Sequence, residues 1–349
     1  MHKNCFVGAG LSAYFAQLLH WRDGDLCLYP SASFSPYALR RPQLEINKFF
    51  SSETKSLGSS AYQLTHATLH DRSALGGNSE IWGGFFDTAQ VSQIEKLIAA
   101  GIRLVPLSYA VTGSISNNPS VVQLQSPDGK ILNVAHHLRA GTHSYLNAIH
   151  CEAGQIKLNC VSADTPHLSE ITVEGKVFVC TGVVQTIDLL MRSQLIQPKD
   201  ELTLDEFAYE LVLGGDPAQQ ADQGASVISY TPGRAAAHLL GIQKARSLSS
   251  IKPFAIHQIF HARTQTLRMV VGDQALIEEG LLTDNRNNAS FGKSIHYCNL
   301  KINGERLVDV AARLSPCLHF VSMASVAQPK PGPISSDIYS YLESIGNEL

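Results

Sequence analysis

The chain opens with a short apolar run, Cys5 to Val7, that leads directly into the pattern Gly8-x-Gly10-x-x-Ala13 and then into apolar residues at helical spacing. In a strand, turn and helix of this kind the first glycine allows a tight turn and the second leaves room for a pyrophosphate. The third position lets the helix pack closely on the strand. The pattern therefore predicts a bound dinucleotide. The expected contacts are Gly8, Gly10, Leu11, Ser12 and Ala13.

Composition is that of an ordinary folded enzyme. The 349 residues are 44% hydrophobic and 16% charged, which suits one large domain or two interleaved ones. A formal net charge of -3 without a basic stripe argues against nucleic acid as a partner. No apolar run approaches the roughly 20 residues of a membrane span, and the motif at residue 8 leaves no room for a leader, so we expect a cytoplasmic protein.

The seven cysteines are scattered and never form a C-x-x-C pair. We therefore expect neither disulfides nor a zinc site. Cys5, Cys27 and Cys180 fall in apolar runs that are typical of strands, where cysteine usually behaves as a small buried hydrophobe. The pair His257 and His261 lies in an alternating, strand-like run, so no metal site is predicted there.

The residues after the second predicted strand, Leu26 to Tyr29, bear on the type of dinucleotide. A Rossmann fold usually places an acidic residue about 20 residues past the glycines, where it binds the adenosine ribose. Here Pro30 and Ser31 stand at that point, and Ser31 or Ser33 offers a weaker hydrogen bond. The missing acid counts mildly against NAD.

A second glycine-rich segment runs from Leu75 to Gly84 and includes one of the two tryptophans. Such a segment allows backbone to approach a flat ring closely. The alternative is a surface loop with glycine turns, in which Ile81 and Trp82 would be costly to expose. The expected cofactor contacts here are Gly76, Gly77, Asn78, Ser79, Trp82, Gly83 and Gly84.

Together with the run Val177 to Thr186 and the apolar residues after it, these segments resemble the glucose-methanol-choline (GMC) oxidoreductase family. The third segment is similar to that family's A-G-A-x-x-T-P-x-L-L-x-x-S-G-I signature. The resemblance implies FAD in a Rossmann-type domain, with Gly182 beside the cofactor, and oxidation of alcohols. It covers the flavin-binding part of the chain.

The resemblance is partial near the C-terminus, where the catalytic residues of the family lie. The best match for the catalytic histidine is His296, and the run Leu318 to Val326 is similar to the family's strand and turn over the flavin, which implies a contact from Ser325. Met323 stands where the family commonly has Asp, and Gly332 replaces the second catalytic polar residue.

A base that titrates near neutral pH suits removal of a hydroxyl proton, and imidazole does so unassisted. His296 is therefore the predicted catalytic base. The alternative is a hydrogen-bonded or solvent-facing strand histidine. His319 is the second choice for the base, although its apolar strand favours a structural role.

The predicted fold class is α/β: a Rossmann-type FAD-binding domain with an interleaved, reduced substrate domain that contains a β-sheet. The expected FAD-binding parts are residues 1–100, 155–200 and 285–349, the last with the catalytic segment. The expected substrate parts are 101–154 and 201–284, with Phe254 and His257 near the substrate.

Local patterns predict further elements. A helix is expected with the apolar stripe Val91 to Ile98, capped by Asp87 and ended by Gly101. A hairpin is expected from the runs Val121 to Gln125 and Ile131 to Val134 around the turn Pro127-Asp128-Gly129. The remaining expected elements are a helix near Leu204 to Leu211, strands at 225–230 and 254–260, and a helix from Ser335 to Ile345.

The leading hypothesis is an FAD-dependent alcohol oxidase or dehydrogenase that acts on a small or flat alcohol, such as an aromatic or pyrrolic methanol in a bacterial biosynthetic pathway. One alternative is an NAD(P)-dependent carbonyl reductase. The other is a flavin-fold protein that binds a partner or metabolite without turnover.

Overall fold

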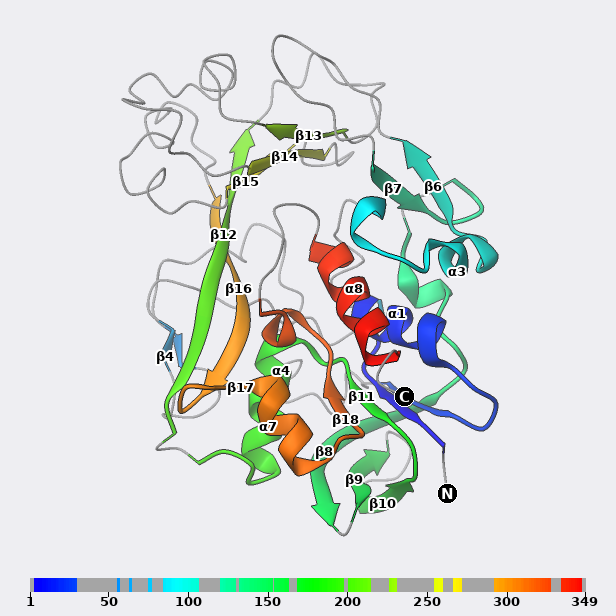
Figure 1. Cartoon of the computed structure of the whole chain (residues 1–349), viewed down its shortest axis with the longest axis vertical. Coiled ribbons are helices and arrows are strands. Elements are labelled where there is room, and N and C mark those ends of the chain that lie inside the picture. The colour runs from blue at the N-terminus through cyan, green and yellow to red at the C-terminus, as the bar shows by residue number, and fades with distance from the viewer. Residues whose placement is uncertain are drawn as a thin grey trace.

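The computed structural model describes residues 3–29, 55–56, 63–64, 75–76, 84–106, 120–129, 132–152, 154–162, 168–197, 200–214, 226–230, 254–259, 266–271, 292–327 and 334–346. These residues form an α/β structure with a mixed sheet, parallel at its centre, at one end and a second, antiparallel sheet beside it (Figure 1). The predicted fold class is confirmed.

The main sheet has seven strands in the order β10-β9-β8-β2-β1-β11-β18. Its central strands pair in parallel, and β8, β9 and β10 form an antiparallel meander at one edge. The strands are β1 (Cys5–Val7), β2 (Leu26–Tyr29), β8 (Thr142–Glu152), β9 (Gln155–Ser162), β10 (Leu168–Val173), β11 (Val177–Val179) and β18 (Leu318–Phe320).

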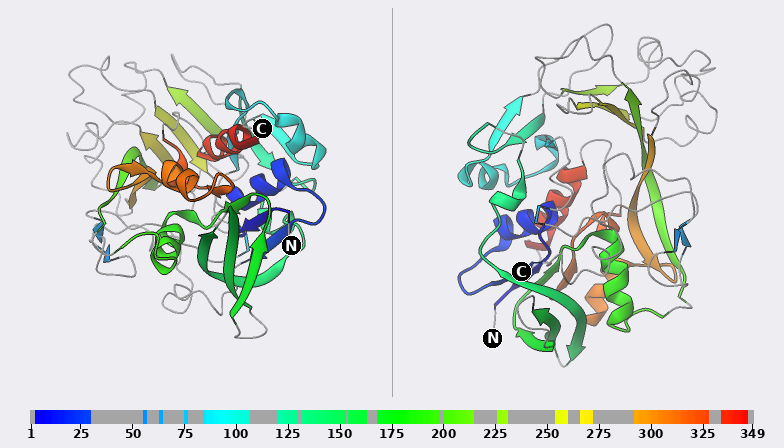
Figure 2. Two further views of the ribbon diagram at one scale, coloured as in Figure 1. Left: turned by 60° about the horizontal axis from the view of Figure 1, so that its bottom comes forward. Right: turned by 180° about the vertical axis from the view of Figure 1, so that it is seen from behind.

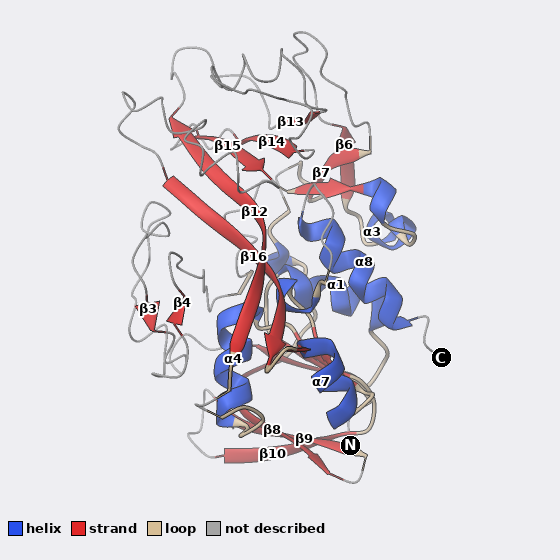
Figure 3. Cartoon of the chain, turned by 60° about the vertical axis from the view of Figure 1, so that its left-hand side comes forward, coloured by secondary structure: helices blue, strands red, loops and turns tan. Residues whose placement is uncertain are grey.

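Helices cover both faces of this sheet. Alternate residues of each parallel strand join different cores: Cys5 and Val7 pack on the side of α4 (Gly182–Arg192) and α7 (Leu307–Leu314), whereas Phe6 packs on the side of α1 (Leu11–His20) and α8 (Ile334–Gly346). Helices α1 and α8 lie side by side (Figure 3). Burial on both faces explains why these strands read as continuous apolar runs.

The second sheet has six strands in the order β13-β14-β15-β12-β16-β17. Its long strands β12 and β16 extend from the region of α4 and α7 up to β13, β14 and β15 (Figures 1 and 2). The strands are β12 (Leu202–Gly214), β13 (Ser226–Tyr230), β14 (Phe254–Ile259), β15 (Thr266–Val271), β16 (Gly292–Ile302) and β17 (Glu305–Arg306). The predicted strands at 225–230 and 254–260 are confirmed.

The predicted helix at 204–211 is wrong, because these residues lie in β12. The β12–β16 pairing shifts register between Thr203 and Asp205 and again between Glu206 and Ala208. Each shift interrupts the two-residue alternation, so the apolar spacing no longer reads as a strand. Pairing with β15 and β16, which are distant in sequence, then outweighs the local preference.

A three-stranded sheet in the order β5-β7-β6 packs near α8. A separate two-stranded sheet pairs β3 (Lys55–Ser56) with β4 (Gln63–Leu64). The turn at Gly129 forms as predicted, with φ of +81° and its N–H 2.9 Å from the Ser126 carbonyl oxygen. In the second arm of the expected hairpin, Ile131 lies outside the described residues. The Leu132 N–H donates to the Leu124 carbonyl oxygen at 3.0 Å, but no strand forms at 132–133 and Val134 begins a 3-10 helix, Val134–His136. Instead β7 (Val121–Gln125) pairs with β5 (Phe85–Asp87) and β6 (Arg103–Pro106).

The helix expected from Val91 begins later, since α3 spans Ile94–Ala99. Asp87 caps a separate 3-10 turn, Thr88–Gln90, by accepting a 3.0 Å hydrogen bond from the Ala89 N–H. The predicted C-terminal helix is confirmed as α8. None of the helices in the described ranges combines the length and apolar character that a bilayer span requires.

Candidate functional site

The turn after β1 is too tight for any residue but glycine at position 8. Gly8 has φ of +113°, and a Cβ atom there would lie 2.4 Å from the carbonyl oxygen of Cys180 at the end of β11. The Gly8 N–H donates to the Leu28 carbonyl oxygen of β2 at 2.9 Å. The first predicted glycine therefore joins the ends of three neighbouring strands.

Helix α1 begins directly after this turn, with Gly10 at its N-cap and no side chain capping its first amides. The first intrahelical bond runs from the Tyr14 N–H to the Gly10 carbonyl oxygen at 3.1 Å. Ala13 is fully buried, which brings the helix close to the sheet. The amides of the first turn, with the positive end of the helix dipole, thus form a site suited to a phosphate group.

The second glycine-rich segment reaches this turn through one of its ends. The Gly76 N–H donates a 2.8 Å hydrogen bond to the carbonyl oxygen of Ala9. At its other end Gly84, with φ of +74°, accepts a 2.7 Å hydrogen bond from the Leu124 N–H. The predicted contacts Gly77, Asn78, Ser79, Trp82 and Gly83 lie outside the described residues.

The turn between β11 and α4 lies beside the first turn. The Cys180 N–H donates to the Val7 carbonyl oxygen at 2.7 Å, and Gly182 begins α4 with φ of +76°. In open α/β sheets ligands bind at the carboxyl ends of the strands, which is where both turns lie. The structure therefore brings together Gly8, Gly10, Gly76 and Gly182.

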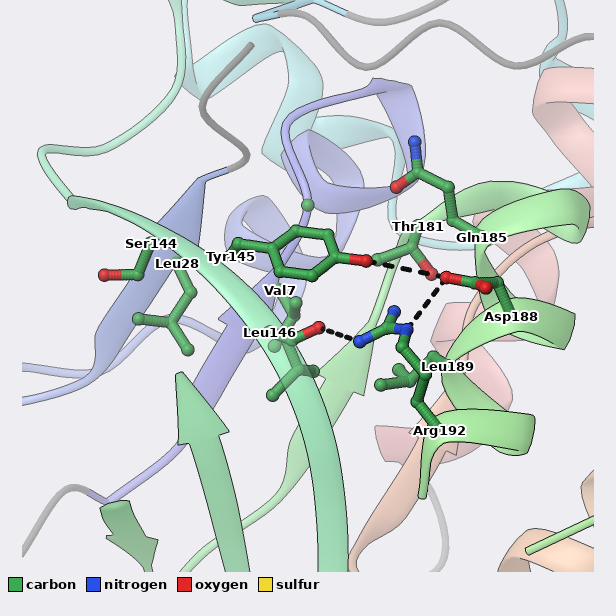
Figure 4. A pocket seen from close by; sticks show the side chains of 11 residues that line it. Val7, Leu28, Ser144, Tyr145, Leu146, Thr181, Gln185, Asp188, Leu189 and Arg192 are labelled. Carbon is green, nitrogen blue, oxygen red and sulfur yellow. Dashed lines mark hydrogen bonds and ion pairs between the residues drawn. The ribbon is translucent and has the colours of Figure 1, made fainter. Parts of the chain in front are cut away.

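A pocket opens at this edge of the sheet (Figure 4). The space between the lining atoms is about 460 Å³, which includes the part open to solvent. Its walls come from the ends of β1 and β2, from β8 and from α4. The lining residues are Val7, Gly8, Leu28, Ser144, Tyr145, Leu146, Thr181, Gln185, Asp188, Leu189 and Arg192.

Three polar side chains form a network on one wall of this pocket. The Arg192 Nε donates to Asp188 Oδ2 at 2.9 Å, and the Tyr145 hydroxyl donates to the same oxygen at 3.5 Å. The Arg192 guanidinium also lies 4.7 Å from the centroid of the Tyr145 ring. These residues were not predicted as part of the site, although an acid and a base four apart on the helix after Gly182 are visible in the sequence.

Tyr29 is the last residue of β2, and a Rossmann fold usually has its ribose-binding acid close to this point. Tyr29 is buried, and its hydroxyl donates to the Arg139 carbonyl oxygen at 2.5 Å while it accepts from Gln17 Nε2 at 3.2 Å. Burial raises the pKa of Tyr29 above its ordinary value, so the phenol stays neutral. Its hydrogen-bonding capacity is used within the protein.

The C-terminal turn follows β18 as a 3-10 helix, Met323–Ser325, that contacts α4, α8 and β16. The buried Ser325 hydroxyl donates to the Phe320 carbonyl oxygen, so it is engaged inside the turn. Met323, at the position where the family commonly has Asp, packs against the core shared by α1 and α8.

The two candidate histidines have different settings. His296 lies in β16, opposite Ala208 of β12, in the strand that contacts the 3-10 turn at Met323–Ser325. His319 lies in β18 and stacks on Phe178 with ring centroids 5.5 Å apart. Burial lowers the pKa of His319 to about 4, and its buried Nε2 has no partner among the described residues, which indicates a neutral structural residue.

The cysteines in or next to the central parallel strands are buried thiols. Cys5, Cys27 and Cys180 are buried as predicted, and burial raises the pKa of each thiol. All seven cysteines are free. The described part of the chain holds no group of three or more His, Cys, Asp or Glu side chains arranged to bind a metal ion.

No protein-family model and no curated protein matches the chain. Solved structures do match at low identity. The rebeccamycin biosynthetic enzyme RebC is 12% identical over 96% of this chain and 60% of its own, with a TM-score of 0.40. A flavoprotein/dehydrogenase from Cytophaga hutchinsonii is 9% identical over 98% and 75%, with a TM-score of 0.43.

The p-nitrophenol 4-monooxygenase PnpA from Pseudomonas putida DLL-E4 is 8% identical over 99% of this chain and 79% of its own, with a TM-score of 0.44. The chain spans 55–60% of the length of the RebC structures that it matches. None of these three proteins is described as a GMC oxidoreductase. At such identities and TM-scores the likeness does not identify a reaction.

Proposed function

We propose that the chain is an FAD-dependent oxidoreductase. The observation that carries the proposal is the glycine turn. The amides at the start of α1 have no side-chain cap, the Gly76 N–H donates to the adjacent Ala9 carbonyl oxygen, and the Cys180 N–H before α4 donates to the Val7 carbonyl oxygen. Gly8 admits no side chain, and Gly10 leaves the first amides open. These features fit a dinucleotide pyrophosphate bound at the carboxyl edge of the sheet.

The residues of this site would hold the cofactor by its phosphates, with the segment that begins at Gly76 beside it. A bound FAD supplies a hydride acceptor. Within this proposal His296 would take the hydroxyl proton of a small alcohol, and FAD would supply the acceptor for the hydride that leaves the carbinol carbon as the aldehyde or ketone forms. The resemblance to GMC oxidoreductases supports this substrate class, with an aromatic or pyrrolic methanol as the candidate.

The visible absorption spectrum of the purified protein tests the cofactor. We expect a flavin spectrum, with FAD released by acid and identified by chromatography. A colourless protein that FAD does not reconstitute would contradict the proposal. If that protein binds NAD(P)H, the carbonyl reductase alternative takes its place.

The test of alcohol oxidation is separate from the test of the cofactor. Anaerobic mixing with a panel of aromatic and pyrrolic alcohols should bleach the flavin. A protein that keeps FAD and shows no bleaching with any alcohol would favour the non-catalytic alternative or a different flavin reaction.

A further inference from the structure

The pocket beside the glycine turn is lined by one carboxylate, that of Asp188. Rossmann folds usually supply the ribose-binding acid after the second strand, where this chain has none. We propose that Asp188 of α4 takes over this role and accepts a hydrogen bond from the adenosine end of the dinucleotide. The inference rests on the dinucleotide binding proposed above.

The pocket is continuous with the expected pyrophosphate position, because Gly8 lines both. Val7, Leu28 and Leu146 line the pocket as an apolar wall and are themselves buried. The polar side chains of α4 face this surface across the pocket (Figure 4). A nucleoside attached to a phosphate at α1 therefore meets apolar contacts on one side and hydrogen-bonding groups on the other.

One carboxylate oxygen of Asp188, Oδ1, is available to a ligand. Both of its hydrogen bonds, from Arg192 and from Tyr145, fall on Oδ2, and none from the described residues falls on Oδ1. The side chain is 22% exposed, so the carboxylate is shielded but reachable. An ionised carboxylate only accepts hydrogen bonds, so its natural ligands are the hydroxyl and amino donors of a nucleoside.

Arg192 is a positioning residue for this carboxylate. Its Nη1 donates to the Leu146 carbonyl oxygen at 2.9 Å and also to the carbonyl oxygen of Asn147, which ties α4 to β8 across the pocket. The guanidinium offsets the charge of Asp188, so the pair presents little net charge. That balance suits the uncharged nucleoside rather than a second phosphate.

The test compares ligands that carry the adenosine end with one that lacks it. ADP, FAD and FMN are titrated calorimetrically into the full-length protein after removal of bound flavin. We expect Asp188→Asn to weaken ADP and FAD binding roughly ten- to hundredfold, the range for a hydrogen bond to a charged group, and to leave FMN unchanged. Asp309→Asn is the control, because Asp309 is a helical aspartate that also pairs with an arginine, Arg306, but lies on the surface of α7 away from the pocket.

Unchanged ADP and FAD binding in Asp188→Asn would overturn the inference while leaving the proposed flavin function intact. Conversely, an Asp188-dependent ADP site in a protein that binds no flavin would retain the inference and overturn the FAD proposal. The two failures are therefore distinguishable.

A second measurement needs only the natural chain, in case the variant does not fold. IDP lacks the adenine amino group, and 2′,3′-dideoxy-ADP lacks both ribose hydroxyls. We expect one of these two ligands to bind roughly tenfold or more weakly than ADP. The group that the weaker ligand lacks is then the donor of the hydrogen bond to Asp188. If both bind as tightly as ADP, no such hydrogen bond exists and the inference is wrong.

Discussion

The carboxylate of Glu343 in α8 accepts a 2.5 Å hydrogen bond from the backbone N–H of Gln93, the N-cap residue of α3, 250 positions earlier in the chain. It also accepts from the Ser92 N–H, at 2.8 and 3.0 Å to its two oxygens. Glu343 is buried, so one side chain of the last helix satisfies the start of a distant one.

Glu343→Ala should lower the free energy of unfolding by about 2 kcal/mol, because it removes hydrogen bonds to a charged group and leaves amides unsatisfied. Glu343→Gln keeps one acceptor oxygen and should lose about half as much. Chemical denaturation measures both. Glu95→Ala, at an exposed position of α3, is the control, and an equal loss there would contradict the capping role.

Gly8→Ala should be strongly destabilising. The new methyl group would meet the Cys180 carbonyl oxygen at 2.4 Å, in addition to the strain of a φ of +113°. Gly154→Ala separates these two effects, since Gly154 has φ of +83° with nothing within 4 Å of its Cβ position. We expect a loss of about 1 kcal/mol for Gly154→Ala and several for Gly8→Ala. Equal losses in denaturant titrations would mean that the close approach to β11 is relieved by a small shift.

His319 should make the fold sensitive to acid. Its pKa falls from an ordinary value of 6.5 to about 4 through burial, with smaller effects from the nearby Lys176 and His20. Between these values the unfolded chain binds more protons, so the free energy of unfolding declines as pH falls from about 6.5 toward 4.

His319→Leu removes this proton uptake and also a buried nitrogen that has no hydrogen-bond partner in the described ranges. The stability of the variant relative to the natural chain should therefore rise as pH falls from 7 to 5, by about 1 kcal/mol or more. Thermal or denaturant unfolding at several pH values measures the difference. A difference that does not change with pH would show that His319 is not held neutral.

His296→Ala should abolish flavin reduction by an alcohol that the natural protein oxidises, while the flavin stays bound. Losing a general base typically costs about 10²–10⁴-fold in rate. Stopped-flow bleaching measures the rate, and the absorption spectrum reports bound flavin. His150→Ala serves as the control, since His150 lies in the β8–β9 meander and pairs with Asn159. An unchanged rate in His296→Ala would remove this residue from the mechanism.

Local sequence was sufficient to predict the strand, glycine turn and helix at residues 5–20, because the pattern that specifies them is contiguous. Gly8 has a positive φ, Gly10 is the N-cap of α1, and Ala13 is fully buried. The three residues lie close together in the chain, although the atom that excludes a side chain at Gly8 belongs to the distant Cys180. The same holds for α8, whose apolar spacing is regular.

The strand β12 and the pocket wall could not be predicted in this way. Two register shifts hide the alternation of β12, and its partners follow it by dozens of residues. Asp188 and Arg192 read as an ordinary helical ion pair until β8 is placed opposite them. In both cases the deciding contacts join segments that are far apart in the chain.

The pairing of β12 with β16 has a consequence for how such a chain can diversify. Val212 of β12 and Gly292 of β16 are paired neighbours, so everything between them leaves and re-enters the rest of the protein at one place. A segment with adjoining ends can be exchanged as a cassette with little disturbance to its surroundings. The replacement has only to cover the edge of β12 that β15 now occupies. A different insert could thus replace this one while the seven-stranded sheet and its helices stay unaltered.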